Sequence, residues 1–198
     1  MMKKVLIGLV VLIGAFVAFV AMQPESYTVT RSATIAAGAD VVFPLVSDFH
    51  SWAKWSPWDE IDKDLKRTYD GAPGAIGSSY GWAGEKTGEG KMTLTAAKPP
   101  EAIDIKLEFI KPFAATNEVT FTFVPTGATT AVTWKMDGHN NLMGKAAGIF
   151  MNFDKMVGGD FDKGLAKLKT VAEADAAKRG AAGTEAAAPA AVPAAPVQ

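Results

Sequence analysis

The stretch that decides the fold is residues 142–172, LMGKAAGIFMNFDKMVGGDFDKGLAKLKTVA. Its apolar residues recur at intervals of three and four, which is the spacing of one face of an α-helix. About 30 residues at 1.5 Å per residue form a helix of roughly 45 Å. A helix of that length crosses the whole concave face of a β-sheet. The sequence therefore predicts one long C-terminal helix that packs on a sheet.

The chain before this helix alternates apolar and polar residues in short segments, which is typical of half-buried β-strands. The connections between these segments are short and rich in Gly and Pro, which favours antiparallel pairing because parallel strands need long crossovers. The predicted fold class is α+β, with a curved antiparallel sheet wrapped around the long helix. Two short helices are expected at 40–46 and 48–54. The predicted strands cover residues 27–35, 78–82, 92–96, 103–109, 118–123 and 132–136.

An uncharged apolar segment, residues 5–22, precedes the first strand. As a helix it would cover about 27 Å, close to the ~30 Å hydrocarbon core of a bilayer. A cleaved secretory signal is the alternative, but the bulky Phe19 stands where cleavage requires a small residue. We therefore expect a transmembrane anchor over residues 5–23.

The charges that flank the apolar segment predict its orientation. Lys3 and Lys4 precede it, whereas only Arg31 follows soon after. By the positive-inside rule, residues 1–4 lie in the cytoplasm and the domain lies outside. The expected location is the bacterial inner membrane, single-pass, with the domain on the periplasmic side.

Composition sets the other limits. The net charge is −1, so no basic face is available to neutralise phosphates, and nucleic acid is not an expected partner. The chain has no cysteine, which removes disulfides, thiolate nucleophiles and cysteine-ligated zinc. The folded domain is expected to span residues 27–175. Residues 176–198 are rich in Ala, Pro and Gly and are predicted to be a disordered tail.

Several short motifs, together with the order of the elements, resemble the SRPBCC superfamily. The motifs are RSATI at 31–35, ADVVF at 39–43, VSDF at 46–49, WSPW at 55–58 and DFDKGL at 160–165. Within the superfamily, the chain is most similar to the START-like proteins of the polyketide cyclase/dehydrase family. The resemblance covers about residues 27–171 and implies a helix-grip fold. The superfamily includes lipid carriers, hormone receptors, aromatase/cyclases and chaperone-associated domains, so the resemblance alone does not fix a function.

Large aromatic residues, flexible methionines and a helix glycine are the candidate ligand-binding residues. Aromatic side chains often line apolar pockets, and methionine adapts its shape to what it contacts. The alternative for most of them is ordinary core packing. The candidates are Trp52, Trp55, Tyr80, Trp82, Phe109, Phe121, Trp134, Gly148, Met151 and Met156.

The long helix contains five glycines: Gly144, Gly148, Gly158, Gly159 and Gly164. Each interior glycine costs roughly 0.5–1 kcal/mol relative to alanine, so a specific requirement for bare backbone is expected. Two explanations stay open. The glycines leave room for a ligand, or they allow close packing on the sheet with a kink at Gly158 and Gly159.

An enzyme would need a general acid or base in the cavity, and Arg31, Asp48, Tyr80 and His139 are the only candidates. Structural roles are favoured for Arg31 and Asp48, and solvated loop positions for His50 and His139. The sequence has no metal-ligand spacing, phosphate loop, nucleophile elbow or dinucleotide motif, so neither a metal nor a cofactor is expected. The acidic residues of 59–64 are expected to form a solvated loop.

The sequence thus leads to one functional hypothesis and two alternatives. The hypothesis is a membrane-anchored domain that binds an apolar small molecule, such as a lipid, a quinone or an isoprenoid-like compound, between sheet and helix. The first alternative is a cyclase or dehydratase. The second is a protein-interaction module that uses the groove or exposed tryptophans and binds no small ligand.

Overall fold

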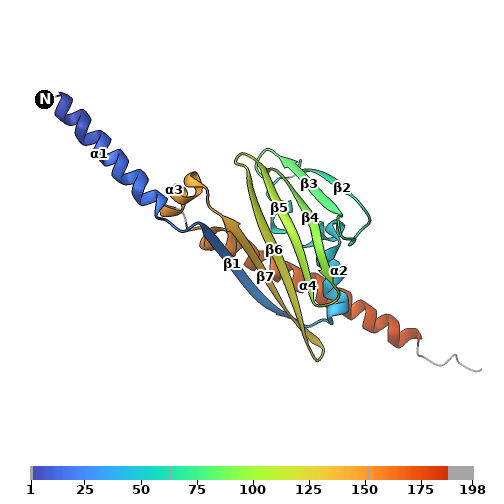
Figure 1. The fold of residues 1–198 in the computed structure, drawn as a ribbon. Coiled ribbons are helices and arrows are strands. Elements are labelled where there is room, and N and C mark those ends of the chain that lie inside the picture. The colour runs from blue at the N-terminus through green and yellow to red at the C-terminus, as the bar shows by residue number, and fades with distance from the viewer. Residues whose placement is uncertain (1, 63, 151, 187–198) are drawn as a thin grey trace, which may run out of the picture.

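The computed structural model describes residues 2–62, 64–150 and 152–186. Its centre is a seven-stranded antiparallel sheet in the order β1-β7-β6-β5-β4-β3-β2 (Figure 1). Strands β2 to β7 follow one another as a meander, and β1 adds to the far side of β7. The predicted antiparallel sheet is confirmed. The strands are β1 (Ser26–Ile35), β2 (Lys66–Asp70), β3 (Ser79–Gly84), β4 (Gly88–Lys98), β5 (Ala102–Lys111), β6 (Ala115–Thr126) and β7 (Thr129–His139).

Strand β2 was not predicted from the sequence. All five of its residues are exposed, so it lacks the alternation of buried and exposed positions that marks the other strands. It lies at the edge of the sheet, where it pairs only with β3. Charged residues such as Lys66 and Arg67 are common on edge strands because they discourage pairing with another chain.

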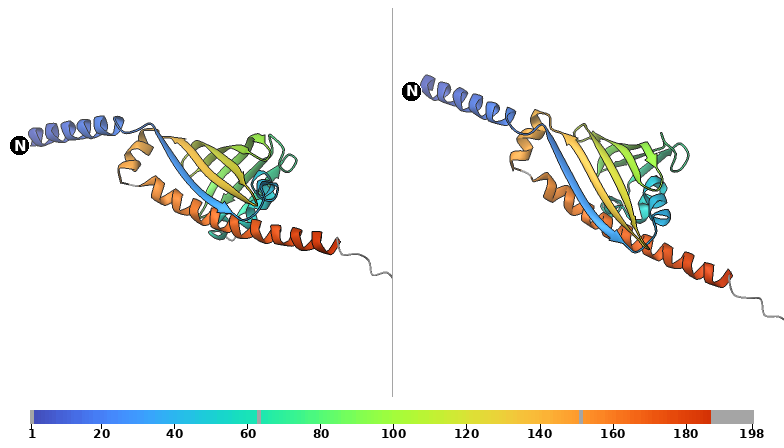
Figure 2. Two further views of the ribbon diagram at one scale, coloured as in Figure 1. Left: turned by 90° about the horizontal axis from the view of Figure 1, so that it is seen from below. Right: turned by 60° about the horizontal axis from the view of Figure 1, so that its bottom comes forward.

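Helix α4 (Phe153–Ala186) runs along the concave face of the sheet (Figure 2). Phe161, Leu165, Leu168 and Ala172 form its buried stripe and belong to the same core as the inward-facing residues of the strands. The long helix packed on the sheet is therefore confirmed, as is the α+β helix-grip architecture.

The predicted continuous helix from residue 142 is in fact two helices, α3 (Leu142–Phe150) and α4. Each begins after an asparagine whose side chain accepts a backbone N–H of the first turn. Asn141 accepts from Gly144 at 2.8 Å, and Asn152 accepts from Lys155 at 2.9 Å. Such N-caps mark helix starts in a sequence. Helix α4 continues through Gly158 and Gly159, the pair at which the close-packing explanation placed a kink.

Helix α4 also extends further than the predicted domain. Residues 176–186, expected to be part of a disordered tail, are helical. Alanine has the highest helix propensity, and Arg179 adds an ion pair to Asp40 of α2 at 3.4 Å. The remainder of the predicted tail, residues 187–198, lies outside the described residues.

Three short helices connect β1 to β2: α2 (Ala39–Ser47), η1 (Phe49–Lys54) and η2 (Pro57–Glu60). The first two correspond to the predicted pair. Asp48 caps η1 as expected, because its carboxylate accepts the backbone N–H of His50 at 2.9 Å. The indole N–H groups of Trp52 and Trp55 donate to backbone carbonyls of α2, at 2.8 and 2.9 Å, and fasten η1 to it.

The loop expected to be solvated at 59–64 is partly buried. The carboxylate of Asp62 is buried and accepts the backbone N–H of Lys86 at 3.0 Å. It also accepts the backbone N–H of Asp64 at 3.3 Å, and the hydrogen bonds from Lys86 and Asp64 lower the pKa of Asp62. Asp59 accepts from the guanidinium of Arg67 on β2 at 2.8 Å. The two aspartates thus fasten this segment to the sheet, which the expectation of a solvated loop missed.

Helix α1 (Met2–Ala21) projects away from the domain (Figures 1 and 2). Within the described part of the chain, it is the one helix long and apolar enough to cross a membrane, a test that a signal sequence near the N-terminus also passes. Of its residues only Val20, in the last turn, is buried. Residues 22–25 connect it to β1.

Candidate functional site

A cavity of about 440 Å³ lies between the concave face of the sheet and α4. Strands β3 to β7 and the start of β1 form its floor, and η1 and η2 form one side. On α4, Met156, Val157, Asp160 and Phe161 cover it. The lining is mostly aliphatic and aromatic.

The strand register shows where on the sheet the cavity lies. One row of paired residues crosses from β1 to β3 and contains Tyr27, Asn117, Leu107, Met92 and Tyr80, all of which line the cavity. The next row toward the β5–β6 turn contributes Phe109 and Trp82. On the other side, one row contributes Met136 and Val119, and the row after it contributes Trp134. These four rows cover about 20 Å at roughly 3.3 Å per residue. The cavity therefore occupies the end of the concave face where β1 begins, next to α1.

Aromatic side chains close the inner end of the cavity. Trp134 stacks on Phe161 with ring centroids 3.9 Å apart, and Trp52 and Trp58 meet Trp134 edge-on at 6.1 and 5.8 Å. Edge-to-face and offset-stacked pairs of this kind are favourable packing geometries. This cluster joins α4 to the sheet and separates the cavity from the core behind it.

The structure brings six of the ten predicted ligand-binding residues to the cavity: Trp52, Tyr80, Trp82, Phe109, Trp134 and Met156. Trp55 and Phe121 do not line it, because they are fully buried in the core behind the aromatic cluster. Gly148 lies in a separate groove between α3 and the start of β1. Met151 lies outside the described residues.

Two polar residues of the floor were not among the predicted site residues. The Tyr27 hydroxyl donates to Oδ1 of Asn117 at 3.3 Å, and burial raises the pKa of Tyr27. Asn117 is only 2% exposed, and its amide nitrogen donates to the sulfur of Met136 at 3.6 Å, a weak acceptor. Strand alternation could have found it, because Asn117 lies two residues before Val119 and so shares the apolar face of β6.

The indole of Trp134 is a further polar group of the cavity floor. Its N–H is buried and meets no acceptor among the residues that the structure describes. Buried polar groups normally have a partner, so each exception calls for an explanation. Trp134 and Asn117 both line the cavity, so within the described residues its floor contains one buried N–H without an acceptor and one buried amide that donates only to a sulfur.

Of the four candidate acid or base residues, Tyr80 alone lines the cavity within the described ranges. Burial raises its pKa to about 12, so its phenol is neutral at physiological pH. The carboxylate of Asp48 accepts the backbone N–H of His50 and so caps η1, and the same oxygen lies 2.9 Å from Nδ1 of the His50 ring. His139 is at the end of β7. No cluster of three His, Asp or Glu side chains suited to a metal is found in the parts of the chain described.

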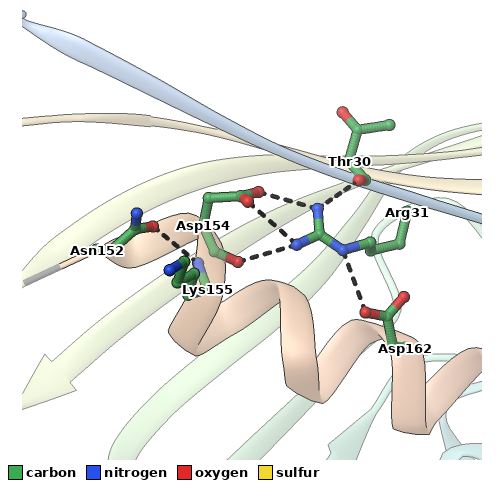
Figure 3. A network of polar contacts seen from close by, with 6 residues as sticks. All are labelled: Thr30, Arg31, Asn152, Asp154, Lys155 and Asp162. Carbon is green, nitrogen blue, oxygen red and sulfur yellow. Dashed lines mark hydrogen bonds and ion pairs between the residues drawn. The ribbon is translucent and has the colours of Figure 1, made fainter.

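Arg31, the fourth candidate, fastens the first turns of α4 to β1 (Figure 3). Its guanidinium donates to both carboxylate oxygens of Asp154, at 2.9 and 3.2 Å, and to the Asp154 carbonyl at 3.1 Å. Its Nε donates to Asp162 at 3.3 Å. The hydrogen bonds to Arg31 lower the pKa of Asp154. This network holds the part of α4 that covers the cavity, which agrees with the structural role favoured for Arg31.

Two helix glycines are explained by close packing. A Cβ on Gly158 would overlap the Arg31 guanidinium, and one on Gly164 would come within 2.8 Å of the Trp134 ring. Gly159 is different, because its added Cβ would meet no atom within 4 Å. Of the two explanations left open by the sequence, Gly158 and Gly164 therefore support helix-on-sheet packing.

An antiparallel sheet that grips a long C-terminal helix over a largely apolar cavity defines the helix-grip class of α+β proteins. The sequence profile of one such family, described as polyketide cyclase/dehydrase and lipid transport, matches residues 26–173. The chain belongs to this family. No curated protein sequence matches it.

Solved structures share the fold at low sequence identity. A protein from Thermobifida fusca aligns with 73% of this chain and 92% of its own, at 19% identity and a TM-score of 0.57. Norcoclaurine synthase from Thalictrum flavum aligns with 74% of this chain and 86% of its own, at 14% identity and a TM-score of 0.56. Aha1 from Colwellia psychrerythraea, solved as a dimer, aligns with 74% of this chain and 96% of its own, at 14% identity and a TM-score of 0.54. These likenesses concern the fold.

Proposed function

We propose that this chain is a membrane-anchored binding protein that holds an apolar small molecule between the sheet and α4. The observation that carries the proposal is the cavity of about 440 Å³ with its largely aliphatic and aromatic lining. Ligand sites in proteins typically measure about 300–1,000 Å³ and have such linings. Removing apolar ligand surface from water contributes about 25 cal/mol per Å², so burial alone supplies the driving force.

The polar groups in the lining narrow the chemical class. The Trp134 indole N–H has no acceptor within the described residues, and the Asn117 amide has only a sulfur. Both favour a ligand that has an apolar body and at least one oxygen acceptor. A quinone, an isoprenoid alcohol and a lipid with a carbonyl all have this character, whereas a pure hydrocarbon does not.

The N-terminal helix supports a location at the membrane, where such ligands dissolve. Helix α1 has 20 residues, all but Lys3 and Lys4 uncharged and most of them apolar, and the domain buries almost none of it. Lys3 and Lys4 at its start favour an outward-facing domain, in the periplasm of a Gram-negative bacterium. In this arrangement the cavity stays beside the bilayer that contains its ligand.

Mass spectrometry of co-purified molecules tests the proposal. The full-length protein is purified from its host in mild detergent and denatured, and the released small molecules are identified. The key variant is Leu107→Trp, which adds bulk to the cavity floor. The matched control is Val124→Trp on β6, at a site that is 58% exposed and outside the cavity.

We expect one compound class, enriched over bulk lipid, in the wild type and in Val124→Trp but lost from Leu107→Trp. Circular dichroism establishes that both variants are folded, and Val157→Phe on α4 provides a second way to fill the cavity. Equal amounts of bulk lipid in all four proteins would sink the binding proposal and favour a role in protein interaction.

A further inference from the structure

We propose that the end of the domain next to α1 lies in the bilayer surface and presents the mouth of the cavity to the lipid. This inference rests on the proposed function, since it assumes that α1 spans the membrane. The membrane-facing surface is defined by exposed apolar side chains of α3 and of the β5–β6 tip: Leu142, Met143, Ile110, Phe113 and Phe150.

Helix α3 has an unpartnered apolar face. With 3.6 residues per turn, Leu142, Met143, Ala146, Ala147 and Phe150 fall within one arc of the helix. The two largest of these at mid-arc, Met143 and Phe150, are 69% and 79% exposed. Amphipathic helices that lie in a membrane interface bury such a face among the lipids.

Contacts at the neck, residues 22–25 between α1 and β1, fix α3 beside the end of α1. The ammonium group of Lys145, on the other side of α3, is buried and donates to the carbonyl of Ala21, the last residue of α1, at 3.2 Å. It also donates to the carboxylate of Glu25 at 3.3 Å. The backbone N–H of Asn140 donates to the Glu25 carbonyl at 2.8 Å. If α1 crosses the bilayer, α3 must therefore lie where α1 leaves it.

The tip between β5 and β6 lies at the same end of the domain (Figure 1). Strand β5 ends and β6 begins at the end of the sheet where β1 starts, as the antiparallel register requires. Phe113 at this tip is 73% exposed, and the neighbouring Ile110 is also exposed. Two separate segments thus display large apolar side chains on the side from which α1 extends.

The cavity reaches this surface. Phe109 and Met156 line the cavity, and both are also partly exposed to solvent. Phe109 is one residue before Ile110, and Met156 is in the first turn of α4, soon after α3. The rim of the cavity is therefore continuous with the membrane-facing surface. Continuity with the α1 span favours the lipid bilayer as the occupant of this surface over a protein.

Spin labels at single cysteines test this placement directly, because the native chain has no cysteine. The full-length protein is reconstituted into vesicles of phosphatidylethanolamine and phosphatidylglycerol. The test positions are Phe113→Cys, Met143→Cys, Phe150→Cys and, at the rim, Met156→Cys. Val10→Cys in α1 is the lipid reference, and Val124→Cys, which is exposed at the opposite end of the sheet, is the water reference. The readout is relaxation by oxygen, which concentrates in lipid, against relaxation by a water-soluble nickel chelate.

We expect all four test labels to respond to oxygen as Val10→Cys does and to be protected from the nickel chelate at least tenfold better than Val124→Cys. Labels that respond like Val124→Cys would overturn the placement. Labels shielded from both reagents would indicate a protein contact, such as a second copy of this chain, and would also overturn it. Ligand extraction is a separate experiment. If the labels are exposed to lipid but no ligand co-purifies, only the binding proposal fails. If a ligand co-purifies but the labels are not exposed to lipid, only this inference fails.

Discussion

Gly158 of α4 lies directly beneath the guanidinium of Arg31, so that the absence of a side chain at residue 158 allows the ion pair between β1 and α4 to form. The neighbouring Gly159 has open space around the position of a Cβ. Two adjacent glycines of one helix therefore have different reasons for being there. Only the first is required by a close approach of a side chain.

Alanine substitutions at these two positions are expected to have opposite effects. Gly159→Ala should stabilise the domain by about 0.5–1 kcal/mol, because alanine costs less backbone entropy in a helix than glycine. Gly158→Ala should destabilise it despite the same gain, because the new methyl group displaces Arg31. Urea unfolding followed by circular dichroism measures both, and equal stabilisation by the two substitutions would contradict the close approach.

The pH dependence of stability should report the ion pair of Arg31 with Asp154. Hydrogen bonding to Arg31 lowers the pKa of Asp154 below its ordinary value of 3.8, so its stabilising effect is fully present above that pH. It is lost as the pH falls through the lower pKa of the folded state. The difference in melting temperature between wild type and Asp154→Asn should be constant near neutral pH and shrink below about pH 4. A difference that persists unchanged in acid would argue against a role for the charge.

The stacked pair of Trp134 and Phe161 should be a major source of stability. Phe161→Ala removes the α4 side of this pair. It should lower the free energy of unfolding by about 3–5 kcal/mol, the usual loss when a buried Phe is replaced by Ala. Phe113→Ala is the control, because Phe113 is exposed, and its effect should stay within about 0.5 kcal/mol. Chemical denaturation of both variants in detergent measures the contrast. Similar losses would mean that α4 is not held by this stack.

Asn117 should influence ligand retention more than stability. Asn117→Leu keeps the size of the side chain and removes a buried amide, but it also removes Oδ1, which accepts from the Tyr27 hydroxyl. These two effects oppose each other, so the free energy of unfolding should change by less than about 1.5 kcal/mol. The amount of oxygen-bearing ligand recovered with the protein should fall by up to about tenfold, because one hydrogen bond contributes about 0.5–1.5 kcal/mol. Mass spectrometry and urea unfolding of the same preparation give the two quantities. Unchanged recovery would show that the amide is not the polar anchor.

Period-two and period-three-to-four patterns were sufficient to predict most of the fold. Strand β5 alternates Ile103, Ile105 and Leu107 with charged residues, so its inward face could be read directly. Strand β2 could not be read in this way, since an exposed edge strand has no buried face. The break between α3 and α4 was missed because apolar spacing continues across it. Asn141 and Asn152, the caps of the two helices, were the signal.

The candidate site was only partly predictable, because an aromatic residue on the inner face of a sheet can line a cavity or fill the core. Trp134 and Phe121 are register partners on neighbouring strands, yet only Trp134 lines the cavity. Their sequence patterns are the same, and the difference depends on where α4 covers the sheet. Asn117 was missed for another reason, namely that the alternation of β6 was traced only from Glu118 onward.

The neck of residues 22–25 sets the reach of the domain. Four residues span at most about 14 Å when fully extended, and the hydrogen bonds of Lys145 and Asn140 hold this neck close to α3. With α1 in the bilayer, the domain cannot travel with its cargo. If the cavity binds a ligand as proposed, the domain can release it only at the membrane surface, and delivery to an acceptor away from the membrane would require a second carrier.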